Sequence, residues 1–282
     1  LARFGGDQPS VVTIHDLIEN EHGLFIVMEY VEGHTLETIL TESGQAMAPK
    51  PAVQLLWRLA AALAAVHNGG IIHRDLKPSN IIVAEGLRPK ITDFGVATSA
   101  SGQTSMLMGT TKYMAPEMFD GGVADARGDM YSLGMIAYEM LLGREAFDEV
   151  FADVVRDPRT ASVRWMKWHG NMAVTAPALA ELNAAIPEIL SDIVARMMAK
   201  NPAERFETME VLGQVIRSDL AGTVLSDDAE TKTPTHAGAV VPLPAVPEAP
   251  PTPVSPTQAE LEESPTMLIP KASLPTKMVV LL

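Results

Sequence analysis

Cysteine is absent from the 282 residues, which excludes disulfides, thiolate nucleophiles and cysteine-ligated zinc. Long apolar runs are absent too, since none reaches the roughly 18–20 residues that a membrane-spanning helix needs. The residues that follow Leu1 also lack the apolar core of a signal peptide. These absences predict a cytoplasmic protein with no membrane span in this chain. They leave open a membrane anchor of a parent protein beyond residue 282.

Basic residues are scarce: Lys and Arg number 21 against 35 Asp and Glu, for a formal charge of -14. Nucleic acids and anionic membranes both reward clustered Lys and Arg, so neither is expected as the main partner. The acidity can serve solubility alone. The composition is 47% hydrophobic, which is enough for a sizeable core.

Proline is unevenly distributed. From about Asp219 aromatic residues disappear, and eleven prolines fall between Pro234 and Pro275. This composition predicts that 219–282 is a Pro-rich disordered tail or linker. Its spaced prolines either bind a proline-recognising partner or act only as a spacer.

Hydrophobic periodicity predicts the elements of the rest of the chain. Two β-rich runs, 11–18 and 24–31, predict a hairpin. Apolar residues at three- and four-residue steps predict a helix over 52–68, ended by Gly69 and Gly70. Further helices are expected over 130–142, 186–198 and 209–216, and short strands over 71–72, 81–83 and 90–92.

The octet His73-Arg74-Asp75-Leu76-Lys77-Pro78-Ser79-Asn80 carries the strongest chemical signal. Phosphoryl transfer to a hydroxyl needs a carboxylate to accept the proton, and Asp75 is the candidate. Asn80, five residues on, offers a neutral oxygen to a metal ion. Lys77 lies between them and can neutralise charge on the transferred group.

Two further motifs follow at fixed distances. Asp93-Phe94-Gly95 begins eighteen residues after Asp75 and offers a carboxylate to Mg²⁺, an apolar plug and a turn. The segment Gly109–Glu117 comes next, and Glu117 can pair with Arg205 far downstream. Losing one member of such a buried pair costs about 3–5 kcal/mol.

Taken in order, these motifs resemble the Hanks-type (eukaryotic-like) serine/threonine protein kinases, in the form found in bacteria. The resemblance covers roughly residues 1 to 218. It implies an α+β, protein-kinase-like fold with a nearly complete helical C-lobe over 32–218. Residues 1–31 then keep only the last part of the N-lobe: the end of helix C, the hairpin and the hinge. The function implied is phosphoryl transfer from ATP to Ser or Thr of protein substrates, with Mg²⁺ as cofactor and Mn²⁺ as the alternative.

The resemblance assigns roles by position. Asp75 matches the catalytic base, Lys77 the phosphate-contacting lysine, Asn80 and Asp93 the magnesium ligands, and Thr110 the threonine that shapes the substrate channel. Met28 matches the gatekeeper, the backbones of Glu29 and Val31 the adenine-binding hinge, and Ile82 the residue beneath the adenine ring. The structural roles implied are an ion pair of Glu117 with Arg205 and a brace for the catalytic loop by Asp129.

Regulation follows from the same resemblance. Arg74 before the catalytic base is the pattern of kinases that are activated by phosphorylation of the activation loop. The best candidates for that phosphate are Thr104 and Ser105, and Phe94 reports active or inactive packing.

The chain also departs from the family. Residues 1–282 contain no Gly-x-Gly-x-x-Gly loop with its downstream lysine, so the chain resembles a kinase truncated at its N-terminus. We therefore expect it to be inactive or nearly so by itself, with an unpaired edge on its hairpin. The alternatives are a non-catalytic scaffold or pseudokinase fragment, which binds partners through the C-lobe and tail, and a small-molecule phosphotransferase. Residues 151–187 form an unusually long stretch whose aromatic and basic part, Arg164–His169, is either a docking surface or, the favoured reading, buried packing.

Overall fold

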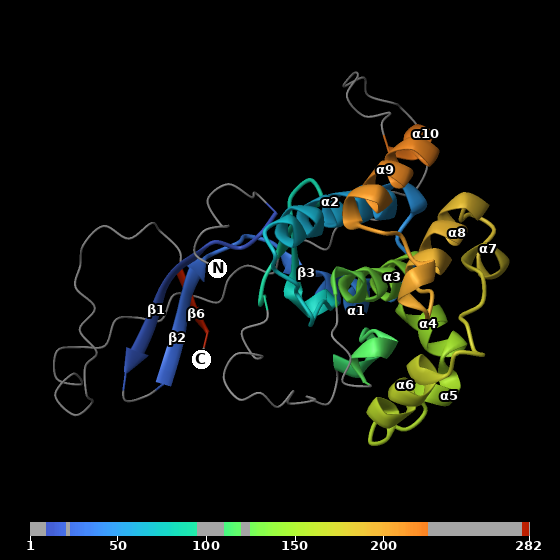
Figure 1. The fold of residues 1–282 in the computed structure, drawn as a ribbon, viewed down its shortest axis with the longest axis horizontal. Helices are drawn as coiled ribbons and strands as arrows, with labels where there is room; N and C mark the ends of the chain where they lie inside the picture. The colour runs from blue at the N-terminus through green and yellow to red at the C-terminus, as the bar shows by residue number, and fades with distance from the viewer. Residues whose placement is uncertain (1–9, 21–22, 95–109, 120–124, 225–277, 282) are drawn as a thin grey trace. The chain divides into compact units, whose positions relative to one another are not determined.

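The computed structural model describes residues 10–20, 23–94, 110–119, 125–224 and 278–281 (Figure 1). The chain divides into one compact unit, Leu1–Asp227 with Met278–Leu282, and a second unit, Asp228–Lys277. All described residues belong to the first unit, so the fold below is the fold of that unit.

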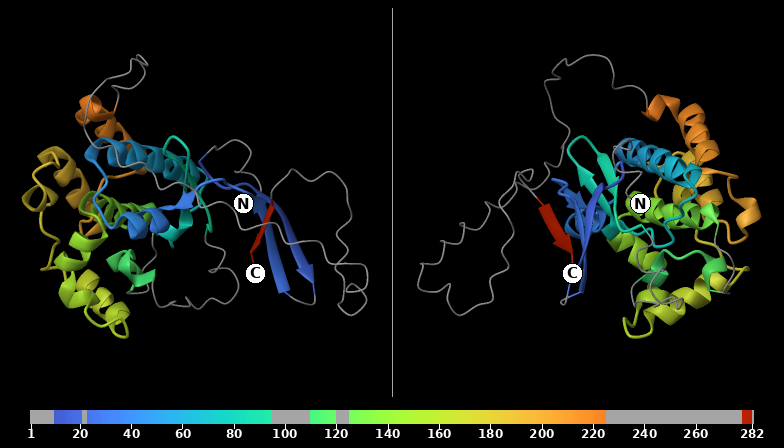
Figure 2. Two further views of the ribbon diagram at one scale, coloured as in Figure 1. Left: turned by 180° about the vertical axis from the view of Figure 1, so that it is seen from behind. Right: turned by 60° about the vertical axis from the view of Figure 1, so that its left-hand side comes forward.

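The predicted hairpin is present as β1 (Ile14–Asn20) and β2 (Gly23–Glu29), which pair in antiparallel fashion. A third strand, β6 (Met278–Leu281), pairs antiparallel with the other edge of β2 (Figure 2). The edge expected to be unpaired is therefore covered. Met278–Leu281 fall within the tail that the sequence predicts to be disordered, but they form this strand. The run is short, apolar and β-branched, so it can satisfy its backbone hydrogen bonds by pairing with β2.

The two predicted catalytic motifs flank the strands of a second sheet. It has the antiparallel order β3 (His34–Thr35), β4 (Ile81–Ala84) and β5 (Arg88–Ile91). The octet enters β4, and β5 leads into Asp93, so this hairpin brings the two motifs to the same end. The strand expected over 71–72 is wrong: the Ile71 amide donates instead to the Val66 carbonyl and closes the preceding helix.

The α-helices hold nearly half of the described residues. The four predicted ones are α2 (Pro49–Asn68), α3 (Ala126–Leu142), α8 (Glu188–Met197) and α9 (Met209–Asp219). The shorter ones are α1 (Leu36–Ser43), α4 (Arg144–Val150), α5 (Ala152–Val155), α6 (Ala161–Gly170), α7 (Leu179–Leu182) and α10 (Ala221–Val224). Within the described ranges, no helix is both long and apolar enough to cross a membrane.

Helix α3 lies at the centre of the helical part, and every residue from Gly128 to Leu142 is buried. It packs against α2 on one side and α8 on another, while α2 also packs against α9. This matches the sequence, where the run from Met130 to Leu142 is apolar around almost the whole helix and needs neighbours on every face.

The long stretch after α4 folds into an aromatic cluster. The ring centroids of Phe151 and Trp165 are 4.9 Å apart, those of Phe147 and Phe151 are 4.7 Å apart, and Trp165 stacks on His169 at 5.3 Å. Trp165 and His169 are buried, whereas Lys167 between them on α6 is exposed. Buried packing is therefore the correct reading for the aromatic positions of this stretch.

His169 is held as a neutral imidazole. Its Nε2 lies 3.1 Å from the Lys112 carbonyl, which can only accept, so Nδ1 accepts the Tyr131 hydroxyl at 2.7 Å. Burial, followed by the nearby charge of Lys200, lowers the pKa of His169 to about 3. A proton on His169 is thus disfavoured in the folded state.

We expect Gly143→Ala to lower the free energy of unfolding by at least about 2 kcal/mol, because Gly143 has φ 79° and a Cβ would clash with the backbone of Gly44, Gln45 and Ala46. Gly213→Ala in α9 is the matched control. Nothing lies within 4 Å of its added methyl, and alanine should stabilise a helix interior by about 0.5–1 kcal/mol. Urea unfolding of both variants checks the prediction, and equal effects would contradict it.

Because the unfolded chain binds a proton at His169 below its usual pKa near 6.5 and the folded chain does so only near 3, stability should fall as the pH drops through that window. His169 alone should give the free energy of unfolding a dependence on pH that approaches about 1.4 kcal/mol per pH unit. His169→Gln cannot titrate but keeps a donor for the Lys112 carbonyl, so its free energy of unfolding should change less with pH between 7 and 4. Parallel curves for the two proteins would rule the prediction out.

Candidate active site

The octet is held in a strained turn by one carboxylate. Arg74 has φ 67°, which is a left-handed conformation that costs about 1–3 kcal/mol for such a residue. The two oxygens of Asp129 accept the His73 and Arg74 amides, each at 2.8 Å, and His67 Nε2 lies 2.8 Å from Asp129 Oδ2. Asp129 stands in the first turn of α3 and is buried. The structure thus places it where the sequence predicts a brace for this loop.

His73 connects the octet to the segment that contains Asp93. Its Nε2 donates to the Thr92 carbonyl at 2.9 Å, which leaves Nδ1 to accept the Asp75 amide at 3.3 Å. Its ring also lies 4.7 Å from that of Phe94. From the sequence, His73 is predicted only as a member of the octet, with no role of its own. His73, the first residue of the octet, is fully buried, and this burial indicates that it has a role in the structure.

Asp75, Lys77 and Asn80 are brought together. Lys77 Nζ lies 2.8 Å from Asp75 Oδ2, and Asn80 Nδ2 donates to the Asp75 carbonyl at 2.9 Å. Asp75 Oδ1 is buried and has no hydrogen-bond partner among the described residues. One carboxylate oxygen is therefore held by a cation, and the other has no partner within the described part of the chain.

Asp93 lies two residues after the end of β5 and has φ 60°. The Thr92 amide donates to the Asn80 carbonyl at 3.0 Å, so the backbones of the two predicted metal ligands are tied together. No group of three or more His, Cys, Asp and Glu that could hold a metal occurs among the described residues. Mg²⁺ uses one or two carboxylates with waters and substrate phosphates, so an Asn and an Asp beside a nucleotide fit it.

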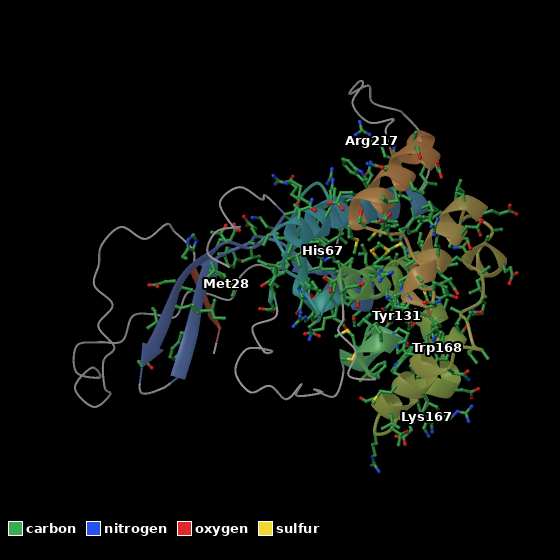
Figure 3. All side chains as sticks on the ribbon, viewed as in Figure 1. Met28, His67, Tyr131, Lys167, Trp168 and Arg217 are labelled. Carbon is green, nitrogen blue, oxygen red and sulfur yellow. The ribbon has the colours of Figure 1, made fainter. Side chains whose placement is uncertain are left out.

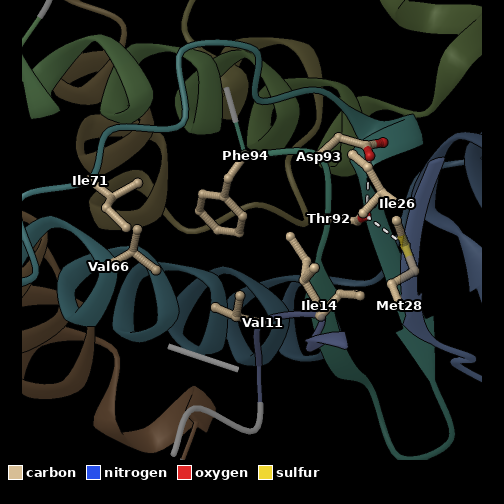
Figure 4. Close-up of a pocket in the computed structure, with 10 residues that line it drawn as sticks. Val11, Ile14, Ile26, Met28, Val66, Ile71, Thr92, Asp93 and Phe94 are labelled. Atoms are coloured by element: carbon tan, nitrogen blue, oxygen red, sulfur yellow. Dashed lines mark hydrogen bonds between the residues drawn. The ribbon is translucent and has the colours of Figure 1, made fainter. Parts of the chain in front are cut away.

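The predicted gatekeeper closes an apolar pocket. Met28 is buried, and its sulfur lies 3.9 Å from Thr92 Oγ1. Behind it is a small cavity of about 30 Å³, where the Phe94 ring lies between Val66 and Ile71 on one side and Thr92 on the other (Figure 4). Phe94 is thereby packed into the apolar interior.

The predicted hinge residues lie beside this pocket. The Glu29 carboxylate accepts Lys90 Nζ at 2.6 Å and the Thr13 amide at 2.8 Å. Burial raises the pKa of Glu29, but these two partners outweigh it and hold the pKa below its usual value. Val31 follows β2, and Ile82 is half-buried on β4. The Glu29 side chain is thus engaged within the protein. Its amide is engaged as well, since it donates to the Thr13 carbonyl at 2.9 Å, and Glu29 pairs with Met278 of β6.

A buried ionic network anchors the segment that precedes Glu117. Glu139 of α3 has no exposed surface and accepts Lys112 Nζ at 2.8 Å, Arg144 Nη1 at 2.6 Å and the Tyr113 hydroxyl at 2.6 Å. Burial raises the pKa of Glu139, but Lys112 and its other partners keep the pKa below its usual value. This network was not predicted from the sequence. A single carboxylate inside an apolar helix was the available signal.

Glu117 and Arg205, which the sequence predicts as a pair, form two parallel hydrogen bonds of 2.7 and 2.8 Å. The Arg205 side chain is fully buried. Its remaining donors reach backbone carbonyls of Arg127, Ala199 and Lys200. The pair therefore connects the segment around Glu117 to the chain that follows α8.

Some predicted residues have no described position. Gly95, Thr104, Ser105 and residues 1–4 lie outside the described ranges, and of Thr110 only the backbone is described, in a short 3₁₀ helix, Thr110–Lys112. Arg74 is exposed, so its guanidinium is open to a partner.

Arg205→Leu should lower the free energy of unfolding by about 3–5 kcal/mol, because it strands the Glu117 carboxylate and leaves buried carbonyls without donors. Glu117→Leu should also destabilise the fold. Since each single change already breaks the pair, the double variant should lose at least about 1 kcal/mol less than the sum of the two. Urea unfolding of the four proteins measures this coupling, and additive losses would refute it.

Comparisons with known proteins agree with this geometry. The sequence profile described as "Protein kinase domain" matches residues 2–215. The serine/threonine-protein kinase PrkC of Bacillus subtilis is 35% identical over 208 residues, which are 72% of this chain and 30% of PrkC. A probable serine/threonine-protein kinase of Clostridium perfringens is 37% identical over 229 residues, covering 79% of this chain and 32% of the relative. PknB of Mycobacterium tuberculosis is 34% identical over 218 residues, covering 72% of this chain and 32% of PknB. The chain thus spans about a third of the length of these curated relatives.

Proposed function

The chain belongs to the protein kinase domain family and resembles its bacterial serine/threonine kinases, and on this premise we propose that it catalyses phosphoryl transfer from ATP to Ser or Thr hydroxyls of proteins. The observation that carries the proposal is the carboxylate of Asp75, whose side chain is 37% exposed and whose Oδ2 lies 2.8 Å from Lys77 Nζ. An accessible carboxylate beside a cation can accept the proton of a substrate hydroxyl.

Asp75 acts as the base that accepts the hydroxyl proton. It keeps its position because its own amide donates to His73 and its carbonyl accepts from Asn80. Lys77 lowers the cost of negative charge around the transferred group. Catalysis of phosphoryl transfer depends mostly on positioning and electrostatics, which this arrangement supplies.

ATP and Mg²⁺, or Mn²⁺ in its place, are the proposed cofactors. Asn80 and Asp93 would hold the metal ion, which when bound neutralises phosphate charge. The backbones of Glu29 and Val31 would hold the adenine edge above Ile82, with Met28 as the gatekeeper. Thr110 is proposed to shape the substrate channel.

Regulation by phosphorylation is part of the proposal. Arg74 is exposed, so a phosphate on Thr104 or Ser105 would find a bidentate, charge-assisted partner in its guanidinium. Phe94 packing then distinguishes the active state from the inactive one. A cytoplasmic location and a proline-binding partner of the tail stay predictions from sequence.

The test compares Asp75→Asn with the unchanged protein and with Asp192→Asn, an exposed acidic residue on α8. Phosphate incorporation into casein and into the protein itself is measured by mass spectrometry with Mg²⁺ and ATP, and ATP affinity by calorimetry. Asp75→Asn should slow transfer by about 10²–10⁴-fold, the usual contribution of a general base. ATP affinity should stay within about threefold, because Asp75 acts on the substrate hydroxyl.

Because residues 1–282 hold no Gly-rich loop, the assay is run on this chain and on the same chain joined to the N-lobe strands of PrkC. The joined protein should transfer phosphate much faster than the chain alone. Transfer that persists in Asp75→Asn would refute the proposed base. Nucleotide binding without transfer in both forms would favour the scaffold alternative.

A further inference from the structure

A second cavity lies between α3, α6 and α8. Its volume is about 350 Å³, which is within the roughly 300–1,000 Å³ range of small-molecule sites. Tyr138 of α3, Trp168 of α6 and Met198 after α8 line it, together with the loop Thr175–Leu179. The lining is mostly apolar, so the cavity suits a hydrophobic body.

One charged side chain, Lys200, also lines this cavity. Lys200 is only 7% exposed, and its Nζ lies 3.5 Å from the centroid of the Trp168 ring. It donates to the Trp168 carbonyl at 2.8 Å and to the His169 carbonyl at 3.3 Å. These carbonyls belong to the last turn of α6, where a cation is favourable.

These contacts give Lys200 neutral partners but no group of opposite charge. An ammonium has three N–H donors, and acceptors for two of them are present. Within the described part of the chain, no carboxylate forms an ion pair with Lys200, and its neighbour His169 is neutral. By contrast, Glu139 and Arg205, which are buried to a similar degree, each have a partner of opposite charge. A buried cation without a counter-charge is costly unless an anion reaches it.

Burial lowers the pKa of Lys200 to about 7. The side chain is therefore poised between its neutral and charged forms, and an anion bound beside it would draw in the proton. Ser191 adds a second polar group to the lining. Its oxygen accepts the Ala180 amide at 3.3 Å, and its hydroxyl proton remains available to an acceptor.

We infer that this cavity binds a small apolar molecule with a single negative charge, such as a medium-chain carboxylic acid, whose carboxylate meets Lys200. The apolar walls formed by Tyr138, Trp168 and Met198 take the hydrocarbon part. One unpaired cation matches one anionic group. This site goes beyond the kinase activity proposed above, and its test does not depend on that activity.

The test uses octanoate and its uncharged analogue 1-octanol as probes, with affinities measured by calorimetry on the chain 1–282. Lys200→Met keeps the length of the side chain and removes its charge. It should weaken octanoate binding by about tenfold or more, the value of a charge-assisted hydrogen bond, and leave octanol binding nearly unchanged. The matched control is Lys167→Met, which removes one exposed charge from α6, next to Trp168 (Figure 3). It should leave both affinities unchanged.

A second variant locates the site. Ala195 is exposed at the rim of the cavity, so Ala195→Trp should block entry without disturbing the core, and both probes should bind more weakly. The inference is overturned if octanoate does not bind below its micelle-forming concentration. It is equally overturned if Lys200→Met and Lys167→Met affect octanoate alike, or if Ala195→Trp leaves both affinities unchanged.

Discussion

The carboxylate of Asp129 is the contact on which the candidate active site depends. It accepts two successive amides of the octet, at His73 and Arg74, and it lies within hydrogen-bond distance of His67. The left-handed conformation of Arg74 is unfavourable in an isolated chain. The hydrogen bonds to the buried Asp129 carboxylate compensate for this cost and keep the turn in place. Asp129 in turn is fixed by α3, which is buried on every side. The rigidity of the helical core is thus passed on to Asp75.

Two buried ionic networks lie in this core, and both involve the segment that ends in Glu117. Glu139 forms salt bridges with Lys112 and Arg144, and Arg205 forms a salt bridge with Glu117. The first network joins the segment Thr110–Met118 to α3 and α4, and the second joins it to the chain that follows α8. Buried ion pairs add little net stability compared with apolar packing, but a broken one is costly. They therefore specify where this segment docks more than they strengthen the fold, and they leave Lys200 as the contrasting case.

Much of the candidate site was predictable because its residues are close in sequence. Asp75, Lys77 and Asn80 lie within one octet, so their proximity follows from local chain geometry. The distance from Asp75 to Asp93 spans one hairpin, β4–β5, whose apolar runs are readable. Glu117 with Arg205 was predictable only through the family resemblance. His73, Glu139 and Lys200 were missed, because a polar residue inside an apolar pattern shows that it needs a partner without showing which one.

The sequence by itself determined the order of the motifs, the family, the main helices and the chemistry available at Asp75, Asn80 and Asp93, because these depend on residue type and short-range spacing. It could not decide that 71–72 cap a helix, that Met278–Leu281 pair with β2, or which oxygen of Asp75 is left free. Those outcomes depend on which donors and acceptors meet across long distances in the chain. Only the packed structure decides that, since every buried polar group must find its partner there.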